Sequence, residues 1–255
     1  MPSLFTRLKQ RNPLLYYFGW LNLLAAFGCL VMTQADNTMV LGINAWIKPA
    51  KFFLSSFIFV WTMAWILVHL EKPRAVKAYS IMVVIVLAFE LYVIAWQAAN
   101  GRLSHFNTTN RFYLLLFNLM GIAISILAVW TAYIGYLFFR KRQFTISPAY
   151  MWGIRLGILF FVLFSFEGAL MAANLSHTIG APDGGPGLPV VNWSTQYGDL
   201  RIAHFAGMHA LQVLPLAGYF VFRRPAGLIL FSTIYFAGVV ALIVMALNGI
   251  PLFNY

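Results

Sequence analysis

The chain has 255 residues, of which 62% are hydrophobic, 17% aromatic and only 9% charged, and its mean hydropathy is +0.80. This composition is typical of an integral membrane protein and excludes a soluble globular domain. The net charge of +11 would suggest nucleic acid as a partner of a soluble chain, but the basic residues stand in short clusters between apolar runs. Because that pattern reports membrane topology, we expect the lipid bilayer as a partner and no nucleic acid.

Apolar windows of about 20 residues predict seven transmembrane helices that form one all-α domain over residues 1–255. The helices are expected at residues 14–33, 51–70, 76–97, 112–139, 149–174, 200–222 and 226–250. The residues before the first apolar run lack a cleavable signal pattern, and the run is long enough to stay in the membrane. We therefore expect the first helix to be retained.

The basic residues concentrate on one side of these seven helices. Eleven lie on that side: Arg7, Lys9, Arg11, Lys72, Arg74, Lys77, Arg140, Lys141, Arg142, Arg223 and Arg224. The other side has five: Lys48, Lys51, Arg102, Arg111 and Arg201. Because loops rich in Lys and Arg remain in the cytoplasm, we expect the N-terminus in the cytoplasm and the C-terminus outside.

The segments on the outer side are longer and richer in turn formers. Residues 34–50 predict a short interfacial helix that ends at Pro49. Residues 175–199 form the longest segment, and its Gly and Pro residues predict a defined irregular loop. These features place the function on the outer face.

Ionisable and amide side chains inside the apolar runs are the strongest indication of a functional site, because lipid cannot solvate them. Glu90 precedes Gln97 by seven residues, and Glu167 precedes Asn174 by the same interval. At about 1.5 Å per residue, both glutamates lie roughly 10 Å below the outer helix ends. The predicted pocket comprises Glu90, Gln97, Asn118, Glu167, Asn174, Arg201, His204, His209 and Gln212.

The sixth predicted helix carries its polar residues on one arc. At about 100° per residue, Arg201, Gln212 and His209 fall within roughly 140° of His204. A polar arc in lipid should face the interior of the helix bundle. Two histidines in the outer loops, His105 and His177, are further candidates that would cap the pocket or extend its ligands.

One hypothesis for the pocket is a metal site that acts on a lipid-like substrate. Imidazole and carboxylate groups together suit Zn or Fe, and the candidate ligands are Glu90, Glu167, His204 and His209. His204 and His209 are five residues apart, about 140° around a helix, whereas ligands on one helix usually stand three or four residues apart. One of the two histidines would therefore support a ligand without binding the ion itself. The sequence does not assign the catalytic residues.

Two alternatives belong to other functional classes. Haem bound by histidines would make the protein a quinone-linked redox protein, although the sequence has no deep histidines on two separate helices. A proton-coupled carrier or small-molecule receptor would titrate Glu90 and Glu167, although no internal repeat supports a transporter. The sequence leaves open whether the protein is an enzyme, and also its oligomeric state.

Two resemblances bear on the topology. Seven helices with a cytoplasmic N-terminus are similar to those of adiponectin-receptor and alkaline-ceramidase hydrolases, but the paired histidines of their last helix have no counterpart in residues 226–250. Residues 181–193 and 198–212 resemble an uncharacterised family of seven-helix bacterial membrane proteins. The second resemblance implies a bacterial inner membrane and supplies no activity.

Overall fold

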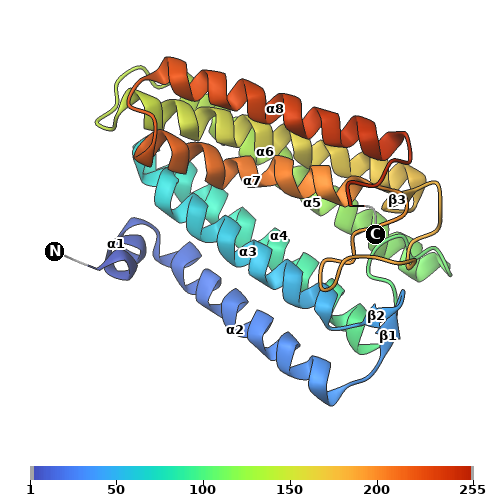
Figure 1. The fold of residues 1–255 in the computed structure, drawn as a ribbon. Helices are drawn as coiled ribbons and strands as arrows, with labels where there is room; N and C mark the ends of the chain where they lie inside the picture. Colours follow the sequence, from blue (N-terminus) through green and yellow to red (C-terminus); the bar gives the residue numbers. More distant parts are fainter. Residues whose placement is uncertain (1–2, 254–255) are drawn as a thin grey trace. The chain divides into compact units, whose positions relative to one another are not determined.

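The computed structural model describes residues 3–253, which are helical apart from loops and two short pairs of strands (Figure 1). The elements are α1 (Leu4–Arg11), α2 (Pro13–Ala35), β1 (Met39–Val40), β2 (Ile43–Asn44), α3 (Ile47–Ile66), the 3₁₀ helix η1 (Leu67–Leu70), α4 (Pro73–Ala99), α5 (Arg111–Arg140), α6 (Pro148–Asn174), β3 (Thr178–Ile179), β4 (Gly198–Asp199), α7 (Leu200–Phe220) and α8 (Pro225–Leu247). Strand β1 pairs with β2, and β3 with β4, both antiparallel. The predicted all-α class is confirmed.

The chain forms two compact units, unit 1 (Met1–Leu127) and unit 2 (Ala128–Tyr255). Unit 1 contains α1 to α4 and the first part of α5, and unit 2 contains the rest of α5 with α6 to α8. Helix α5 continues without a break through the boundary between them. The expectation of one domain over residues 1–255 stays a prediction.

Among the described residues, six helices are long and apolar enough to cross a membrane: Pro13–Ala35, Ile47–Leu70, Pro73–Ala99, Arg111–Arg140, Pro148–Asn174 and Pro225–Leu247. They coincide with six of the seven predicted transmembrane helices, so the chain is a multi-pass membrane protein. The remaining prediction, residues 200–222, corresponds to α7, which is a helix of 21 residues but is not among the six. Its four polar side chains, Arg201, His204, His209 and Gln212, lower its hydropathy.

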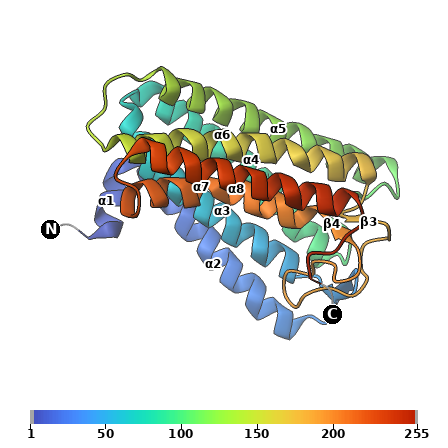
Figure 2. The same ribbon diagram turned by 45° about the horizontal axis from the view of Figure 1, so that its top comes forward.

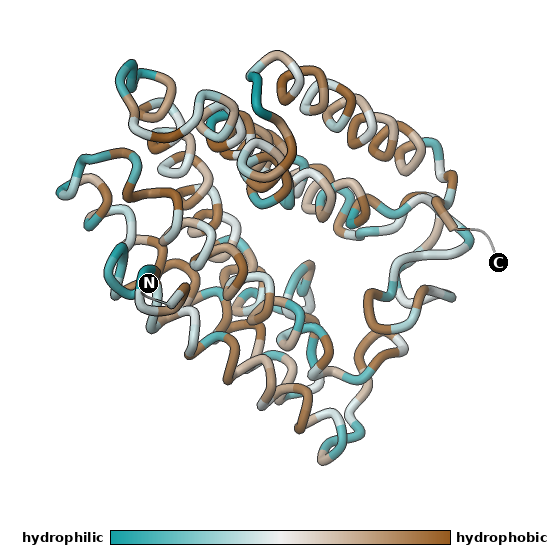
Figure 3. Tube along the Cα trace, turned by 60° about the vertical axis from the view of Figure 1, so that its left-hand side comes forward, coloured by the Kyte–Doolittle hydropathy of each residue, from teal (hydrophilic) through white to brown (hydrophobic). Residues whose placement is uncertain are grey.

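Large apolar side chains cover the outside of the helices. On α2, Leu24 and Phe27 are each 66% exposed, and on α8 Leu230 and Ile234 are each 63% exposed. The hydropathy colouring of Figure 3 shows brown running along the helices and teal gathered at the turns. Large exposed apolar faces are rare on soluble monomers and mark surfaces that contact a membrane or another protein. Together with the six apolar helices, they indicate a lipid bilayer environment.

The interfacial helix predicted for residues 34–50 is wrong. Residues 39–44 instead form the β1–β2 hairpin, whose turn residues Leu41 and Gly42 both have positive φ. A two-residue turn of this kind matches the right-handed twist of paired strands. Asp36 holds the hairpin by accepting hydrogen bonds from Thr38 N (2.9 Å) and Trp46 Nε1 (2.8 Å). Local side-chain bonds to the backbone thus compete with the helix, which begins only at Ile47.

Arg155 in α6 carries a buried charge with a structural role. Its guanidinium donates from Nε to Phe138 O (3.1 Å) and from Nη2 to Lys141 O (2.7 Å). Phe138 and Lys141 lie at the C-terminal end of α5, where the last carbonyls have no partner within the helix. A cation there also interacts favourably with the helix dipole. Arg155 therefore ties α6 to the end of α5.

The closest helix packing in unit 2 joins α6 and α7, with α8 packed against both (Figure 1, Figure 2). A Cβ added to Gly153 of α6 would lie 2.5 Å from Leu214 O, and one added to Gly157 would lie 3.0 Å from Ala210 O. The two glycines stand four residues apart, as in the small-residue motifs of membrane helix pairs. On α7, Gly218 meets Ala149 O in the same way, at 2.5 Å. The two backbones are therefore in contact along most of their length.

We expect Gly153→Ala to destabilise the protein by roughly 1–3 kcal/mol, because the new methyl group must push α7 away from α6. The measurement is thermal unfolding of the full chain in detergent. The matched control is Gly238→Ala on α8, where a new Cβ meets nothing within 4 Å. That variant should be neutral or slightly stabilised, since Ala favours a helix over Gly by about 1 kcal/mol. Equal effects of the two substitutions would contradict the backbone contact.

Candidate functional site

The centre of the candidate site is a hydrogen bond between α6 and α7. Glu167 Oε2 lies 3.1 Å from His204 Nδ1. The glutamate lies seven residues before the end of α6, and the histidine lies one turn into α7. The imidazole rests against Gly168, where an added Cβ would lie 3.5 Å from His204 Cε1. A predicted glutamate and a predicted histidine, 37 residues apart in the chain, are thus brought together.

The pair is largely buried and incompletely bonded. The Glu167 side chain is 4% exposed and the His204 side chain 28%. Within the described part of the chain, Glu167 Oε1 is buried and has no hydrogen-bond partner. An unpaired buried carboxylate oxygen is costly, so this atom marks a place for a proton, an ion or a polar ligand group.

Two protonation arrangements satisfy the contact between the two side chains. If Nδ1 carries the hydrogen, it donates to the carboxylate, and Nε2 keeps a lone pair that accepts a proton or binds a metal ion. If the carboxyl group carries the hydrogen, it donates to Nδ1, and Nε2 becomes a donor. The pair can therefore exchange one proton between two groups, which is the basis of general acid–base chemistry.

His209 lies in a different environment from His204. Its Nδ1 is 3.1 Å from Gln212 Oε1 on the same helix. Its ring packs edge-on against Phe205, with 4.3 Å between the ring centroids, and Phe205 in turn contacts Trp193 of the preceding loop. His209 therefore bonds along its own helix, whereas His204 bonds across to α6, as their wide separation around the helix suggests.

In unit 1, the predicted pocket residues Glu90 and Gln97 are both buried on α4, 7% and 1% exposed. Among the residues the structure describes, the Oε1 atom of each side chain has no hydrogen-bond partner. Their seven-residue separation puts them on one face of the helix, as predicted.

Asn118 of α5 is exposed. His105 bonds to the neighbouring Ser104 Oγ at 3.0 Å, and its ring lies 5.6 Å from that of Phe52.

The loop between α6 and α7 is organised by two aspartates that the sequence analysis did not single out. Asp183 accepts hydrogen bonds from the Ser176 hydroxyl (2.9 Å), from His177 N (3.0 Å) and from Thr178 N (3.0 Å). Its Oδ2 also lies 2.5 Å from His177 Nδ1. His177 is therefore part of the loop framework, and the predicted irregular loop is a defined structure.

The second aspartate, Asp199, joins the loop to the start of α7. It caps the helix by accepting from Arg201 N (3.0 Å) and pairs with the Arg201 guanidinium, whose Nη2 is 2.5 Å from Oδ2. Arg201 also donates to Asn192 O, and Ser194 N donates to Asp199 Oδ2 (2.8 Å). Asn174 Nδ2 bonds to Thr178 O at 3.3 Å. Arg201 and Asn174, both predicted for the pocket, are thus engaged in holding the loop.

The predicted metal ligands Glu90, Glu167, His204 and His209 are not found as a group. Over residues 3–253, no cluster of three or more His, Cys, Asp or Glu side chains has an arrangement able to hold a metal ion. Within unit 2, Glu167 bonds to His204 and His209 bonds to Gln212. The metal site therefore stays a prediction, with His204 and Glu167 as its best-placed pair.

Comparisons with protein-family models, with curated proteins and with solved structures find no match for the chain. The function is therefore inferred from the geometry of the site.

We expect the loop to lose stability in acid through Asp183. Burial would raise the pKa of this carboxyl, but the hydrogen bond and charge of His177 lower it well below the unfolded value of 3.8. A depressed folded-state pKa means that the stabilisation is complete above about pH 4 and declines as the pH falls toward the folded-state pKa. Hydrogen exchange of the His177 and Thr178 amides should show this decline.

Asp183→Asn should lower protection of these amides about tenfold or more at neutral pH, because hydrogen bonds to a charged group contribute roughly 1.5–3 kcal/mol. It should also remove the pH dependence. Asp36→Asn, which loosens the β1–β2 hairpin of unit 1, is the matched control and should leave the His177 and Thr178 amides unchanged. A pH profile that persists in Asp183→Asn would exclude Asp183 as its origin.

Proposed function

We propose that all seven predicted helices cross the membrane, with the N-terminus in the cytoplasm and the C-terminus outside. The support is the packing of α7: its backbone follows that of α6, one of the six apolar helices, from Gly218 beside Ala149 to His204 beside Gly168. At about 1.5 Å per residue, its 21 residues reach roughly 30 Å, enough for the hydrocarbon core. The distribution of basic residues supports the orientation, and the sequence resemblance supports a bacterial inner membrane.

The location of the two termini distinguishes this topology from one with six transmembrane helices. Six helices would leave both termini on the same side of the membrane. In a bacterial host, we expect green fluorescent protein to fluoresce at the N-terminus and to be dark at the C-terminus, because it does not fold after export in unfolded form. Alkaline phosphatase at the C-terminus should be active. Fluorescence at both termini would contradict the seven-helix topology.

We further propose that the protein is an enzyme that performs general acid–base chemistry on a lipid-like substrate, with Glu167 and His204 as its working pair. The observation that carries this proposal is the contact between Glu167 Oε2 and His204 Nδ1, next to the unpaired Oε1. In this role Nε2 of His204 takes a proton from a hydroxyl group or water. Glu167 holds the ring by Nδ1 and stabilises the imidazolium that forms, as the carboxylate of a catalytic triad does.

The substrate class follows from the position of the pair. Glu167 lies roughly 10 Å below the end of α6, inside a helix that crosses the bilayer. A substrate must therefore carry its reacting group into the hydrocarbon region, which a hydrophobic or lipid-like molecule does at little cost. The partial exposure of the His204 side chain supports access to Nε2.

A second candidate is a metal or haem centre, and the same contact favours it. Histidines that bind metals usually donate their other ring N–H to a carboxylate, which fixes the tautomer and leaves Nε2 for the ion. Zn or Fe, or the iron of a haem, would then be held by Nε2 of His204, and the ion would supply Lewis-acid or redox chemistry.

The test uses the full chain purified in detergent and transferred to nanodiscs of total bacterial lipid. We expect one lipid species to be converted, with the rate falling roughly 10²–10⁴-fold in His204→Gln and in Glu167→Gln, the range for loss of acid–base catalysis. Thr233→Ala, at an exposed position of α8 where the hydroxyl bonds only to Ile229 O within the described chain, is the control and should retain the rate.

Metal analysis and an absorption spectrum of the same preparations separate the two candidates. A stoichiometric metal or a Soret band that disappears in His204→Gln would select the metal or haem centre. The acid–base enzyme would be excluded if the wild-type protein converted no lipid. It would also be excluded if His204→Gln and Glu167→Gln converted lipid at the wild-type rate.

A further inference from the structure

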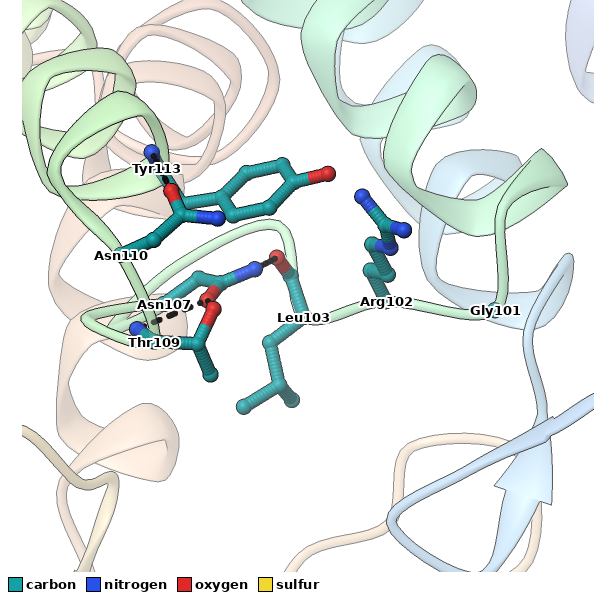
Figure 4. A pocket seen from close by; sticks show the side chains of 7 residues that line it. All are labelled: Gly101, Arg102, Leu103, Asn107, Thr109, Asn110 and Tyr113. Atoms are coloured by element: carbon teal, nitrogen blue, oxygen red, sulfur yellow. Dashed lines mark hydrogen bonds between the residues drawn. The ribbon is translucent and has the colours of Figure 1, made fainter.

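Unit 1 contains a second polar site, in the segment that joins α4 to α5. A cavity of about 400 Å³ is lined by Gly101, Arg102, Leu103, Asn107, Thr109, Asn110 and Tyr113 (Figure 4). Every one of these residues lies within 13 positions of the chain, between Gly101 and Tyr113. The cavity is therefore a property of this loop and does not involve Glu167 or His204.

The location of the loop places the cavity at a membrane surface. Helices α4 and α5 are both apolar enough to cross the bilayer, so the ten or so residues that connect them must lie at the level of the lipid headgroups. Aromatic rings gather at the same height: Trp96 contacts Phe112 with 6.1 Å between centroids and Tyr113 with 6.3 Å. Such rings are typical of the membrane interface.

The cavity carries a positive charge that no acidic group neutralises within the described residues. The Arg102 guanidinium stands over the ring of Tyr113, 4.9 Å from its centroid, and makes no ion pair there. Glu71 lies near the opposite end of α4, and Glu90 lies inside that helix. Asp36 is held by Thr38 and Trp46. Arg102 is exposed, and its donors remain open to a ligand.

The other polar groups of the cavity are also arranged as donors. Asn110 accepts a hydrogen bond from Tyr113 N at 3.0 Å through Oδ1, which leaves its amide nitrogen with two hydrogens and no partner in the described chain. In Figure 4 this nitrogen and the Arg102 guanidinium flank the Tyr113 ring. The Tyr113 hydroxyl is a third donor on the same wall.

The floor of the cavity is held in place by Asn107, which is 4% exposed. Its amide donates to Leu103 O at 3.2 Å, and its Oδ1 accepts from the Thr109 hydroxyl at 2.7 Å and from Thr109 N at 3.3 Å. These bonds fix the loop before a ligand arrives. A preformed site loses less conformational entropy on binding.

We infer that this cavity binds a phosphate group. A planar guanidinium is the side chain best matched to phosphate oxygens, and hydrogen bonds between charged partners are the strong ones. An amide and a phenol beside it supply further donors. At the membrane surface the phosphate group can come from the headgroup of a lipid or from a soluble phosphate, and both present the same oxygens.

The binding test compares three probes on the full chain in detergent. Phosphatidic acid and a diacylglycerol with identical acyl chains differ only in the phosphate group, and native mass spectrometry measures the Kd of each. Inorganic phosphate, titrated by calorimetry, lacks the acyl chains. We expect saturable binding of phosphatidic acid and at least tenfold weaker binding of the diacylglycerol.

Two substitutions test the site, and a third is the matched control. Arg102→Gln should raise the Kd for phosphatidic acid about tenfold, the loss expected for a hydrogen bond to a charged group. Asn110→Asp keeps an oxygen to accept from Tyr113 N, since Asp is as good a helix cap as Asn, but replaces the donor by a negative oxygen. It should weaken binding about tenfold without unfolding the loop. Arg111→Gln, at an exposed position outside the cavity lining, should change the Kd less than about threefold.

The outcomes separate the source of the phosphate from the existence of the site. If inorganic phosphate also binds, and Arg102→Gln and Asn110→Asp raise its Kd as much as they raise that of phosphatidic acid, the phosphate group alone is sufficient for binding. If phosphatidic acid binds and inorganic phosphate does not, the ligand is the headgroup of a lipid. Equal binding of diacylglycerol, an unchanged Kd in Asn110→Asp, or an equal loss in Arg111→Gln would overturn the proposal.

Discussion

The backbone contact between α6 and α7 is the interaction on which unit 2 depends. Helix α7 carries two histidines, an arginine and a glutamine, so it is too polar to be favoured alone in lipid. Gly153 and Gly157 let it approach α6 until backbone meets backbone. Between helices in a membrane, such close van der Waals packing replaces the hydrophobic effect as the source of association. The same contact brings His204 to Glu167.

The buried and half-buried polar groups of the protein fall into two kinds. The hydrogen bonds of Arg155, Asp183 and Asp199 hold a helix end or a loop in place. Glu90 and Glu167 each keep one buried oxygen without a partner among residues 3–253. A fully bonded buried group stabilises the fold, whereas an unpaired one is maintained at a cost. Glu167 combines such an unpaired oxygen with a hydrogen bond to His204, and the proposed chemistry is therefore assigned to these two residues.

The two proposed sites use different chemistry. The Glu167–His204 pair lies between α7 and the apolar helix α6, where a proton can move between two groups with little competition from water. The cavity at residues 101–113 lies in a loop at a membrane surface, where an uncompensated guanidinium attracts anions. A lipid has both an apolar body and a phosphate-bearing headgroup, so each site suits a different part of such a molecule.

Apolar windows along the chain were enough to predict the seven long helices α2 to α8, because lipid requires every backbone N–H and C=O to be bonded within a helix. They did not predict the short helix α1, which has no apolar run. Glutamates and histidines inside these runs were identified as exceptional for the same reason. The hairpin at residues 39–44 was predicted as a helix, since the side-chain bonds of Asp36 that stabilise it are not visible in a hydropathy pattern. Asp183 was overlooked because its donors are backbone groups of a loop. Partners across helices depend on which faces meet, so only the tertiary packing of α6 against α7 decided that Glu167 bonds to His204.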